Sequence, residues 1–194
     1  MKQSYSVLSF IFLLFILPMG LVYSQNGIPD NKGKEFWLMF NRNLDNIGIN
    51  PDLFITGDIG TKGWVYLPND VEIAFSVVPG EITKIDLPVS ILATDEEEIS
   101  QKGVHIIAEN EITVYGLNQR IYSTDAFLGL PTDVLGKEYV VMSNTTLITD
   151  RTVSYSLLGI VAPLDKTEIT IIPASDTRNR KKGIPFKINL NKGE

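Results

Sequence analysis

Residues 53–87 read LFITGDIGTKGWVYLPNDVEIAFSVVPGEITKIDL, and this stretch decides the fold class. It holds four short runs rich in β-branched and aromatic residues, separated by clusters of Gly, Pro, Asn and Asp. The four runs are Leu53–Thr56, Gly63–Leu67, Val71–Val78 and Glu81–Leu87. Several short strands at such regular spacing are typical of an antiparallel sandwich or barrel. We therefore predict an all-β fold, an antiparallel β-sandwich.

Two local patterns sharpen this prediction. In Val71–Val77 the odd positions are apolar and the even positions are Glu, Ala and Ser, which predicts one buried and one solvated face. Pro79 and Gly80 suit the two central positions of a type II turn, since Pro presets φ and Gly accepts a positive φ. We expect this turn to join its two flanking strands as a hairpin.

The rest of the chain extends the same pattern. A polar connection at residues 109–111 predicts a second hairpin, and helix should be limited to one turn near Ala93–Ser100. A second small sandwich could follow after about Tyr139. The further predicted strands are Glu35–Asn41, Val104–Glu109, Glu111–Leu117, Glu138–Ser143, Val153–Ala162, Thr167–Ile172 and Ile184–Leu190.

The N-terminus has the pattern of an export signal. Lys2 precedes an apolar run, Val7–Val22, which Pro18 and Gly20 cut short of the ~20 apolar residues that a membrane span needs. An uncleaved anchor helix is the alternative. We expect residues 1–24 to be a signal peptide, 25–33 a leader and 34–194 one β domain, the first part of a longer protein. The mature chain would then have no membrane span.

Composition narrows the classes of partner. The chain has 194 residues, a net charge of −6 and no cysteine. An acidic balance disfavours nucleic acid and anionic membrane surfaces as partners. An exported domain without disulfides must be held by packing and hydrogen bonds, which favours a bacterial surface protein.

The residues that could carry chemistry do not form a catalytic or metal-binding pattern. His105 is the only histidine, lies within a predicted strand and has no Gly-x-Ser-x-Gly motif to serve, so we interpret it as structural. The loop with Asn43, Asp45 and Asn50 could hold calcium but lacks the spaced carboxylates of a calcium loop. The acidic run 95–98 is interpreted as a solvated loop. We predict no catalytic residue, no metal ligand and no cofactor.

Ser123–Tyr139 is the least ordinary stretch, since it is both apolar and rich in turn residues. Gly129, Pro131 and Gly136 would interrupt a helix or a central strand. We predict a packed connection that crosses a core. The apolar residues expected to be buried in it are Ala126, Phe127, Leu128, Leu130, Val134 and Leu135.

Several segments together resemble a known family. Tyr115-Gly116-Leu117-Asn118 followed by Ser123-Thr124-Asp125-Ala126-Phe127, with Lys102–Ile106 and Gly33–Trp37 before them, resembles the N-terminal domain of the IgG Fc-binding protein. The resemblance runs from about Gly33 to about Pro173. The residues that carry it, in a binding or a structural role, are Tyr115, Gly116, Asn118, Ser123, Thr124, Asp125, Phe127, Pro131, Asp133, Gly136 and Tyr139.

The resemblance implies a secreted, β-rich binding or adhesion module at a cell surface, held there by regions outside this chain. Its ligand would be an extracellular glycoprotein, a mucin or another protein, and the resemblance supplies no catalytic residue. Two alternatives stay open. One is a spacer module of a large surface protein, and the other is an extracellular hydrolase with Asp125 and Asp133 as its carboxylate pair.

Overall fold

The computed structural model describes residues 30–43, 50–94, 97–120, 123–144, 147–148 and 153–194. The chain divides into two units, residues 1–30 and 31–194, and every element described below belongs to the second. The predicted boundaries of a signal peptide at 24 and a leader at 33 fall in or near the first unit and stay predictions.

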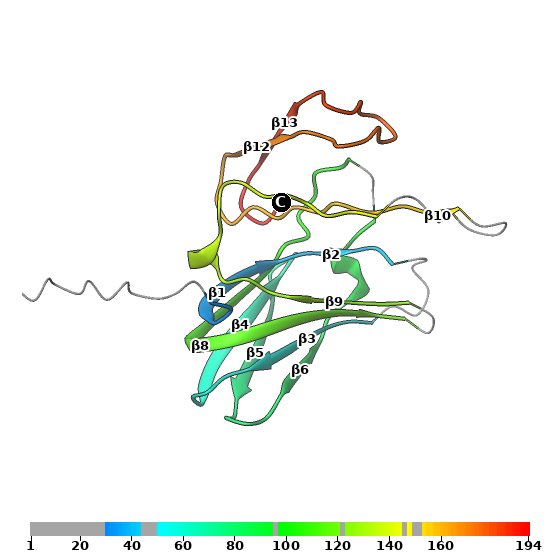
Figure 1. Ribbon diagram of the computed structural model, residues 1–194. Coiled ribbons are helices and arrows are strands. Elements are labelled where there is room, and N and C mark those ends of the chain that lie inside the picture. The colour runs from blue at the N-terminus through cyan, green and yellow to red at the C-terminus, as the bar shows by residue number, and fades with distance from the viewer. Residues whose placement is uncertain (1–29, 44–49, 95–96, 121–122, 145–146, 149–152) are drawn as a thin grey trace, which may run out of the picture. The chain divides into compact units, whose positions relative to one another are not determined.

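One long strand, β8 (Val104–Gln119), organises the main sheet (Figure 1). Its first half pairs with β1 and β4, and its second half pairs with β3 and β9. All of these pairs are antiparallel, as predicted. β5 pairs with β4 and β6 with β3, so the strand order is β5-β4-β8-β3-β6. The bounds are β1 Gly33–Leu38, β3 Asn50–Thr56, β4 Thr61–Leu67, β5 Val71–Val77, β6 Thr83–Asp86 and β9 Thr124–Leu128.

The two halves of this sheet share one hydrophobic core. Phe36, Val65 and Ile106 come from the first half and have no exposed surface. They belong to the same buried cluster as Leu53 and Val114 of the second half. The predicted all-β, sandwich-like class is therefore confirmed, because two sheet layers that continue into each other along β8 bury a common face.

The predicted hairpin at residues 109–111 is wrong. β8 continues through Glu109-Asn110-Glu111 without a turn. These residues are polar because this is where the strand changes neighbours, from β4 to β3, and where Glu109 and Glu111 are exposed. The backbone N–H of Asn110 donates to Thr61 Oγ1 at 2.9 Å. A polar break in a sequence pattern thus marks a change of sheet half and not a turn.

The Pro79-Gly80 turn is confirmed, but the hairpin predicted around it is wrong. Glu81 N donates to Val78 O at 3.0 Å, and Gly80 has a φ of 82°. The strands on either side do not pair with each other, because β5 pairs with β4 and β6 pairs with β3. The turn carries the chain from an edge of one sheet half to an edge of the other.

Ser123–Tyr139 also differs from the prediction. Its first part is the edge strand β9, and after Pro131 it forms a single 3-10 turn, η2 (Thr132–Val134). Phe127 packs against the core, whereas most of the other apolar residues face solvent. Those found exposed are Ala126, Leu128, Leu130 and Leu135. β9 has one sheet neighbour, β8, so no further strand lies beside Ala126 and Leu128 to cover them, and Leu130 and Leu135 lie past the end of β9.

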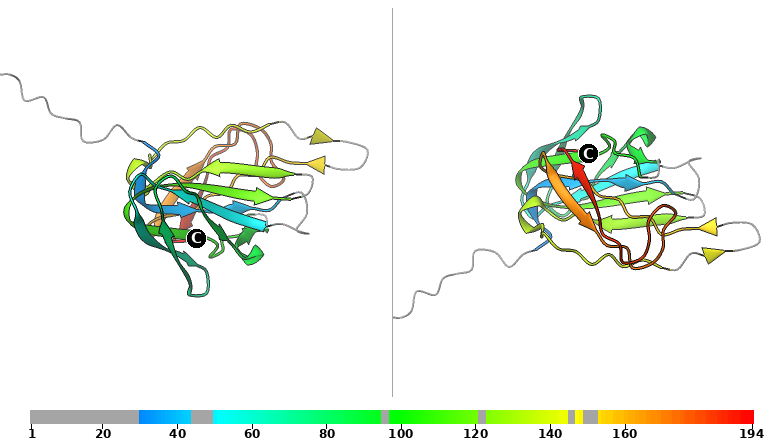
Figure 2. Two further views of the ribbon diagram at one scale, coloured as in Figure 1. Left: turned by 90° about the horizontal axis from the view of Figure 1, so that it is seen from below. Right: turned by 90° about the horizontal axis from the view of Figure 1, so that it is seen from above.

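The C-terminal part forms two small antiparallel sheets, and no second sandwich appears among its described residues. β10 (Leu147–Ile148) pairs with β11 (Val153–Ser154), and β12 (Thr167–Ile171) pairs with β13 (Phe186–Leu190). The predicted strand at 138–143 is wrong: this segment is extended but unpaired, and Val140 and Met142 are more than 90% exposed. Figure 2 shows β10 and β11 away from the main sheet.

Short elements complete the described part. β2 (Phe40–Asn41) pairs in parallel with β7 (Leu92–Ala93). A 3-10 turn, η1 (Val89–Ile91), precedes β7, and helix is minimal as predicted, although the turn lies before the expected Ala93–Ser100. Among the described residues, none of the helices has the length and apolar character needed to cross a membrane.

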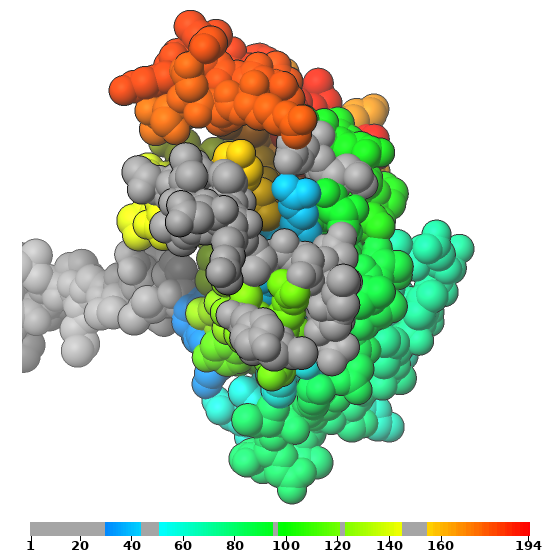
Figure 3. All heavy atoms as spheres, turned by 90° about the vertical axis from the view of Figure 1, so that its right-hand side faces the viewer, coloured from blue at the N-terminus to red at the C-terminus, as the bar shows by residue number. Residues whose placement is uncertain are grey.

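The end of the chain covers one part of the main sheet. Gly103 N donates to Gly193 O, Gly193 N donates to Ala162 O, and Ala162 N donates to Glu194 O. This contact holds the residues before β12 and after β13 next to β1 and the start of β8. Figure 3 shows the atoms of the β12–β13 hairpin in orange and red at one end of the described surface and those of β4–β6 in cyan and green at the other.

Candidate binding faces

Six of the eleven residues that carry the family resemblance lie in the hairpin of β8 and β9. Tyr115 lies opposite Leu128, Gly116 opposite Phe127 and Asn118 opposite Asp125. A Cβ on Gly116 would lie 2.4 Å from the Phe127 ring, so the ring occupies the space that a side chain would take. Glycine is required here by close approach, and the Gly–Phe pair has a structural role.

Asn118 and Asn43 fix the end of this hairpin. Asn118 Nδ2 donates to Asn41 O at 2.8 Å, and the Asn118 carbonyl accepts from Asn43 Nδ2 at 3.3 Å. Asn43 Nδ2 also donates to Ser123 O at 3.2 Å. Asn43, one of the three residues considered for calcium, is therefore used as a hydrogen-bond donor, while Asp45 lies outside the described residues.

The segment from Pro131 to Tyr139 follows β9 and is fixed by its own contacts. Pro131 is buried and forms an isolated bridge with Phe36. The backbone N–H of Gly136 donates to Tyr139 Oη at 2.7 Å. The other family residues, Thr124, Asp125 and Asp133, are exposed. The predicted residues are thus split between a structural group and an exposed group.

The outer surface of this half of the sheet forms two cross-strand rows, which we call the motif face. One row is Lys84–Phe54–Tyr115–Leu128, and the other is Asp86–Asp52–Leu117–Ala126. The part of this face formed by β3, β8 and β9 is mostly apolar, with Phe54, Tyr115, Leu117, Ala126 and Leu128. Tyr115 is 45% exposed and Leu128 39% exposed, so large side chains here remain open to solvent.

The other side of the motif face is charged. Lys84 Nζ lies 2.6 Å from Asp86 Oδ1 and 3.2 Å from Asp52 Oδ2. The Asp52 side chain is only 2% exposed, and burial raises its pKa above the usual value, with Lys84 opposing and the Asp86 carboxyl adding to the rise. Hydrogen bonds from Lys84 hold the pKa of Asp86 below its usual value. The three groups make a compact polar rim beside the apolar rows.

The outer surface of the first half of the sheet is aromatic, and we call it the aromatic face. Its two rows are Glu72–Tyr66–His105–Trp37 and Ala74–Trp64–Ile107–Glu35. The His105 ring stacks on Trp37 with centroids 4.2 Å apart, and Tyr66 lies 5.7 Å away on its other side. Lys192 Nζ lies 5.5 Å above the Trp37 ring, so the end of the chain covers this part of the face.

His105 is linked to two other elements. Its Nε2 lies 2.8 Å from Glu35 Oε1, and Thr132 Oγ1 donates to Glu35 Oε2 at 3.2 Å. Burial lowers the pKa of His105, and the Glu35 carboxylate only partly opposes this. Burial alone would raise the pKa of Glu35, but the hydrogen bond and charge of His105, with Thr132, hold that pKa below its usual value. The histidine joins β1, β8 and η2.

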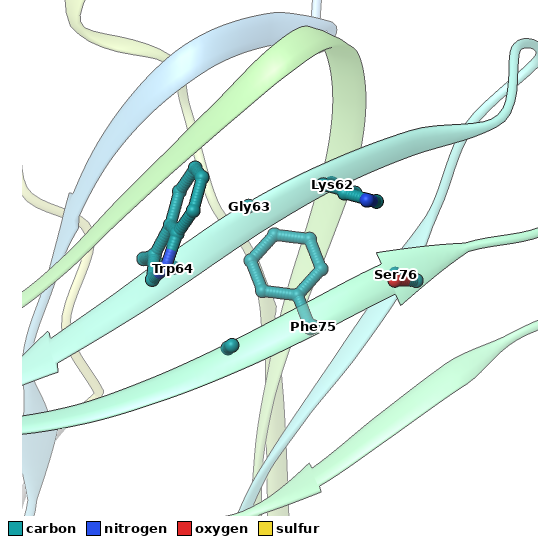
Figure 4. Close-up of a pocket in the computed structure, with 6 residues that line it drawn as sticks. Lys62, Gly63, Trp64, Phe75 and Ser76 are labelled. Carbon is teal, nitrogen blue, oxygen red and sulfur yellow. The ribbon is translucent and has the colours of Figure 1, made fainter.

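At the uncovered end of the aromatic face lies a shallow pocket beside Trp64 (Figure 4). It is small, at about 200 Å³, against roughly 300–1,000 Å³ for sites of drug-sized ligands. Trp64 is 37% exposed. The lining residues are Lys62, Gly63, Trp64, Ala74, Phe75 and Ser76.

Comparison with known families decides the relationship of the C-terminal part. Residues 125–194 match the family model described as IgGFc binding protein. Over these residues the chain is similar to the IgGFc binding protein family. No match to the chain was found among curated proteins or among solved structures.

The IgGFc-binding segment begins inside β9 and contains all of β10–β13. The family predicted from the sequence is therefore confirmed, over residues that overlap the predicted range up to Pro173 and continue past it. The match leaves residues 33–124 uncovered, including Tyr115, Gly116 and Asn118. These three residues contact the IgGFc-binding segment in the structure, because their strand, β8, pairs with β9.

The two carboxylates considered for hydrolysis are not brought together. Asp125 lies in β9, opposite Asn118, while Asp133 lies in η2, beyond the bridge between Pro131 and Phe36. Asp125 and Leu128 of β9 are already about 10 Å apart at ~3.3 Å per residue, and the chain continues through Gly129 and the Pro131 bridge before it reaches Asp133. Glycosidase carboxylates lie about 5–10 Å apart, so this pair does not have that geometry.

Sequence reasoning missed Trp64, Phe54 and Lys84 as surface residues. The signal was present, since Lys62, Trp64 and Tyr66 alternate with Gly63, Val65 and Leu67 in a predicted strand. Both sets contain large residues, so alternation alone could not say which face was buried. The pairing of β4 with β8 through Val65 and Ile106 decides it.

Proposed function

We propose that this chain is a non-catalytic binding module of an exported, cell-surface protein, and that it recognises an extracellular protein or glycoprotein. The proposal rests on the similarity of residues 125–194 to the IgGFc binding protein family together with an exposed apolar face on the hairpin where that segment begins. Spacer and hydrolase functions are the alternatives to test against it.

The motif face has the composition of a protein-binding surface. Contiguous exposed apolar side chains on a folded protein mark interaction sites, and Tyr is enriched among residues that dominate binding energy. Tyr115 and Leu128 lie side by side in one cross-strand row, next to the half-buried Phe54. The Lys84, Asp52 and Asp86 rim supplies charges at the border, where interfaces are polar.

A binding screen tests this proposal. The purified protein would be assayed by surface plasmon resonance against IgG Fc, mucin and a panel of host glycoproteins, in calcium and in chelator. For the ligand found, Tyr115→Ala with Leu128→Ala should weaken binding at least tenfold, the size expected when central aromatic contacts are removed. Tyr155→Ala, at an exposed tyrosine outside the two rows of the motif face, is the matched control and should leave binding unchanged.

The outcomes separate the alternatives. Ligand binding that survives the double substitution would place recognition elsewhere on the protein. A blank panel from folded protein would favour a spacer module. Turnover of a glycan or peptide in the same panel, lost on substituting Asp125 and Asp133 by Asn, would instead support the hydrolase.

A further inference from the structure

The pocket beside Trp64 combines features that a sugar ring requires. Trp64 lies between Ala74 and Ile107 in its cross-strand row. Ala74 is small and exposed, so nothing long from β5 covers the indole on that side. An exposed indole face next to a small residue is a surface on which a flat ligand can stack.

The pocket also has a free cation. Lys62 lies opposite Ser76 across β4 and β5, and both line the pocket with Trp64. Lys62 is exposed and has no ion pair within the described ranges, and none of the six lining residues is acidic. Lys62 is the one charged side chain among these six lining residues. The positive charge of Lys62 therefore attracts an anionic ligand.

We propose that this pocket binds a pyranose sugar that carries a carboxylate, as sialic and uronic acids do. The apolar face of the ring stacks on Trp64, the carboxylate faces the Lys62 ammonium and a ring hydroxyl reaches the Ser76 hydroxyl. The volume of about 200 Å³ limits the site to about one sugar residue. This site lies on the opposite half of the sheet from the motif face and is independent of it.

A titration tests the site on the purified protein. Methyl glycosides of N-acetylneuraminic acid and of glucuronic acid distinguish the two sources of the carboxylate, and methyl galactoside is the neutral comparison. Binding is followed by ¹H–¹⁵N NMR through the indole N–H signals, of which the chain has two. We expect the Trp64 signal to shift saturably with one or both acids and at least tenfold more weakly with the neutral sugar.

Matched substitutions separate stacking from charge. Trp64→Ala should weaken binding of the acid at least tenfold, whereas Trp64→Tyr keeps an aromatic face and should retain part of it. Lys62→Gln should remove the preference for the acid over methyl galactoside. Lys137→Gln, at another exposed lysine with no ion pair in the described part of the chain, and Tyr115→Ala on the motif face should both bind like the unchanged protein.

The proposal fails if folded protein shows no saturable shift with either acid. It also fails if the neutral sugar binds equally well, or if Lys62→Gln has no effect on the preference. Because Tyr115→Ala tests the motif face separately, loss of protein binding with intact sugar binding would leave this site standing, and the reverse result would leave the proposed function standing.

Discussion

At the scale of single residues, Gly116 shows most directly how a sequence motif becomes structure. Phe127 fills the space above it, with ring atoms 2.4–2.9 Å from the position of a Cβ. The Phe127 ring in turn meets Phe40 edge-on, with centroids 5.2 Å apart. An aromatic ring above a glycine of the neighbouring strand lets the two strands and β2 pack closely.

Gly116→Ala should therefore destabilise the fold by about 1–3 kcal/mol, the usual cost of forcing extra volume into a packed site. Urea unfolding measured by far-ultraviolet circular dichroism gives the change in free energy. Gly60→Ala is the control, because a Cβ there would meet nothing closer than 3.7 Å. Adding Phe127→Leu to Gly116→Ala should recover part of the loss; an additive double variant would show that the ring is not the cause.

His105 predicts how stability depends on pH. Its folded pKa is lowered by burial from the ordinary value of 6.5, so the folded protein takes up this proton less readily than the unfolded chain. The stability it contributes is complete above about pH 6.5 and is lost as the pH falls through the folded pKa. Glu35, with a lowered pKa, stays ionised in the same range.

The free energy of unfolding should therefore fall between pH 7.5 and pH 5.5. His105→Gln, which keeps a hydrogen-bonding group without titrating, should show a smaller fall. The chain has one histidine, which makes the comparison clean. Equal falls in both proteins would mean that His105 does not control the pH dependence. The Asp52 carboxyl, with its raised pKa, acts in the opposite direction, because the folded protein takes up its proton more readily than the unfolded chain.

At the scale of elements, β8 is the strand on which both sheet halves depend. It has a partner on each side along both of its halves, while β5, β6 and β9 each pair on one side. Amides of Ile106 and Val114, buried in the middle of each half, should exchange with deuterium only on global unfolding. Amides of the unpaired segment 138–143 should exchange much faster, and exchange of β8 at the same rate would contradict its central position.

The elements also show what the sequence could and could not predict. Strands β3, β4 and β5 follow from their β-branched and aromatic residues and from the turn residues between them, and the Pro79-Gly80 turn follows from its local chemistry. Pairing does not follow, because a turn fixes the chain direction over four residues but not which strand lies alongside. The predictions of a hairpin at 109–111 and of a strand at 138–143 were wrong for this reason. Each depended on which strand, distant in the sequence, lies alongside.

The candidate faces were predictable only in part. The β8–β9 hairpin carries the residues singled out in the sequence, but which of them face solvent depends on β9 lying at an edge. Phe54 and Lys84 lie beside Tyr115 because of the register in which β3 and β6 pair, and no local sequence pattern predicts that register. Trp64 was visible as an aromatic residue of a strand, and only the pairing with β8 showed that it faces outwards.

At the scale of the whole described unit, the IgGFc-binding segment is not separable from the residues before it. β9 pairs only with β8, and Gly129 N donates to Val114 O of the same strand. At its other end the segment lies against Gly103 and near Trp37. Both ends of the family segment are therefore held by strands that the family match does not cover.

Residues 125–194 alone should consequently not fold, whereas 31–194 should. Without β8 and β1 the segment retains the β12–β13 hairpin of five residue pairs, and an isolated two-stranded hairpin is at best marginally stable in water. We expect poor dispersion in the ¹H–¹⁵N NMR spectrum of 125–194 and no cooperative unfolding in urea, against a dispersed spectrum and a single transition for 31–194. A cooperative transition of 125–194 by itself would show that the family segment has its own core, and that its contacts with β8 and β1 form an interface between two domains and not a shared fold.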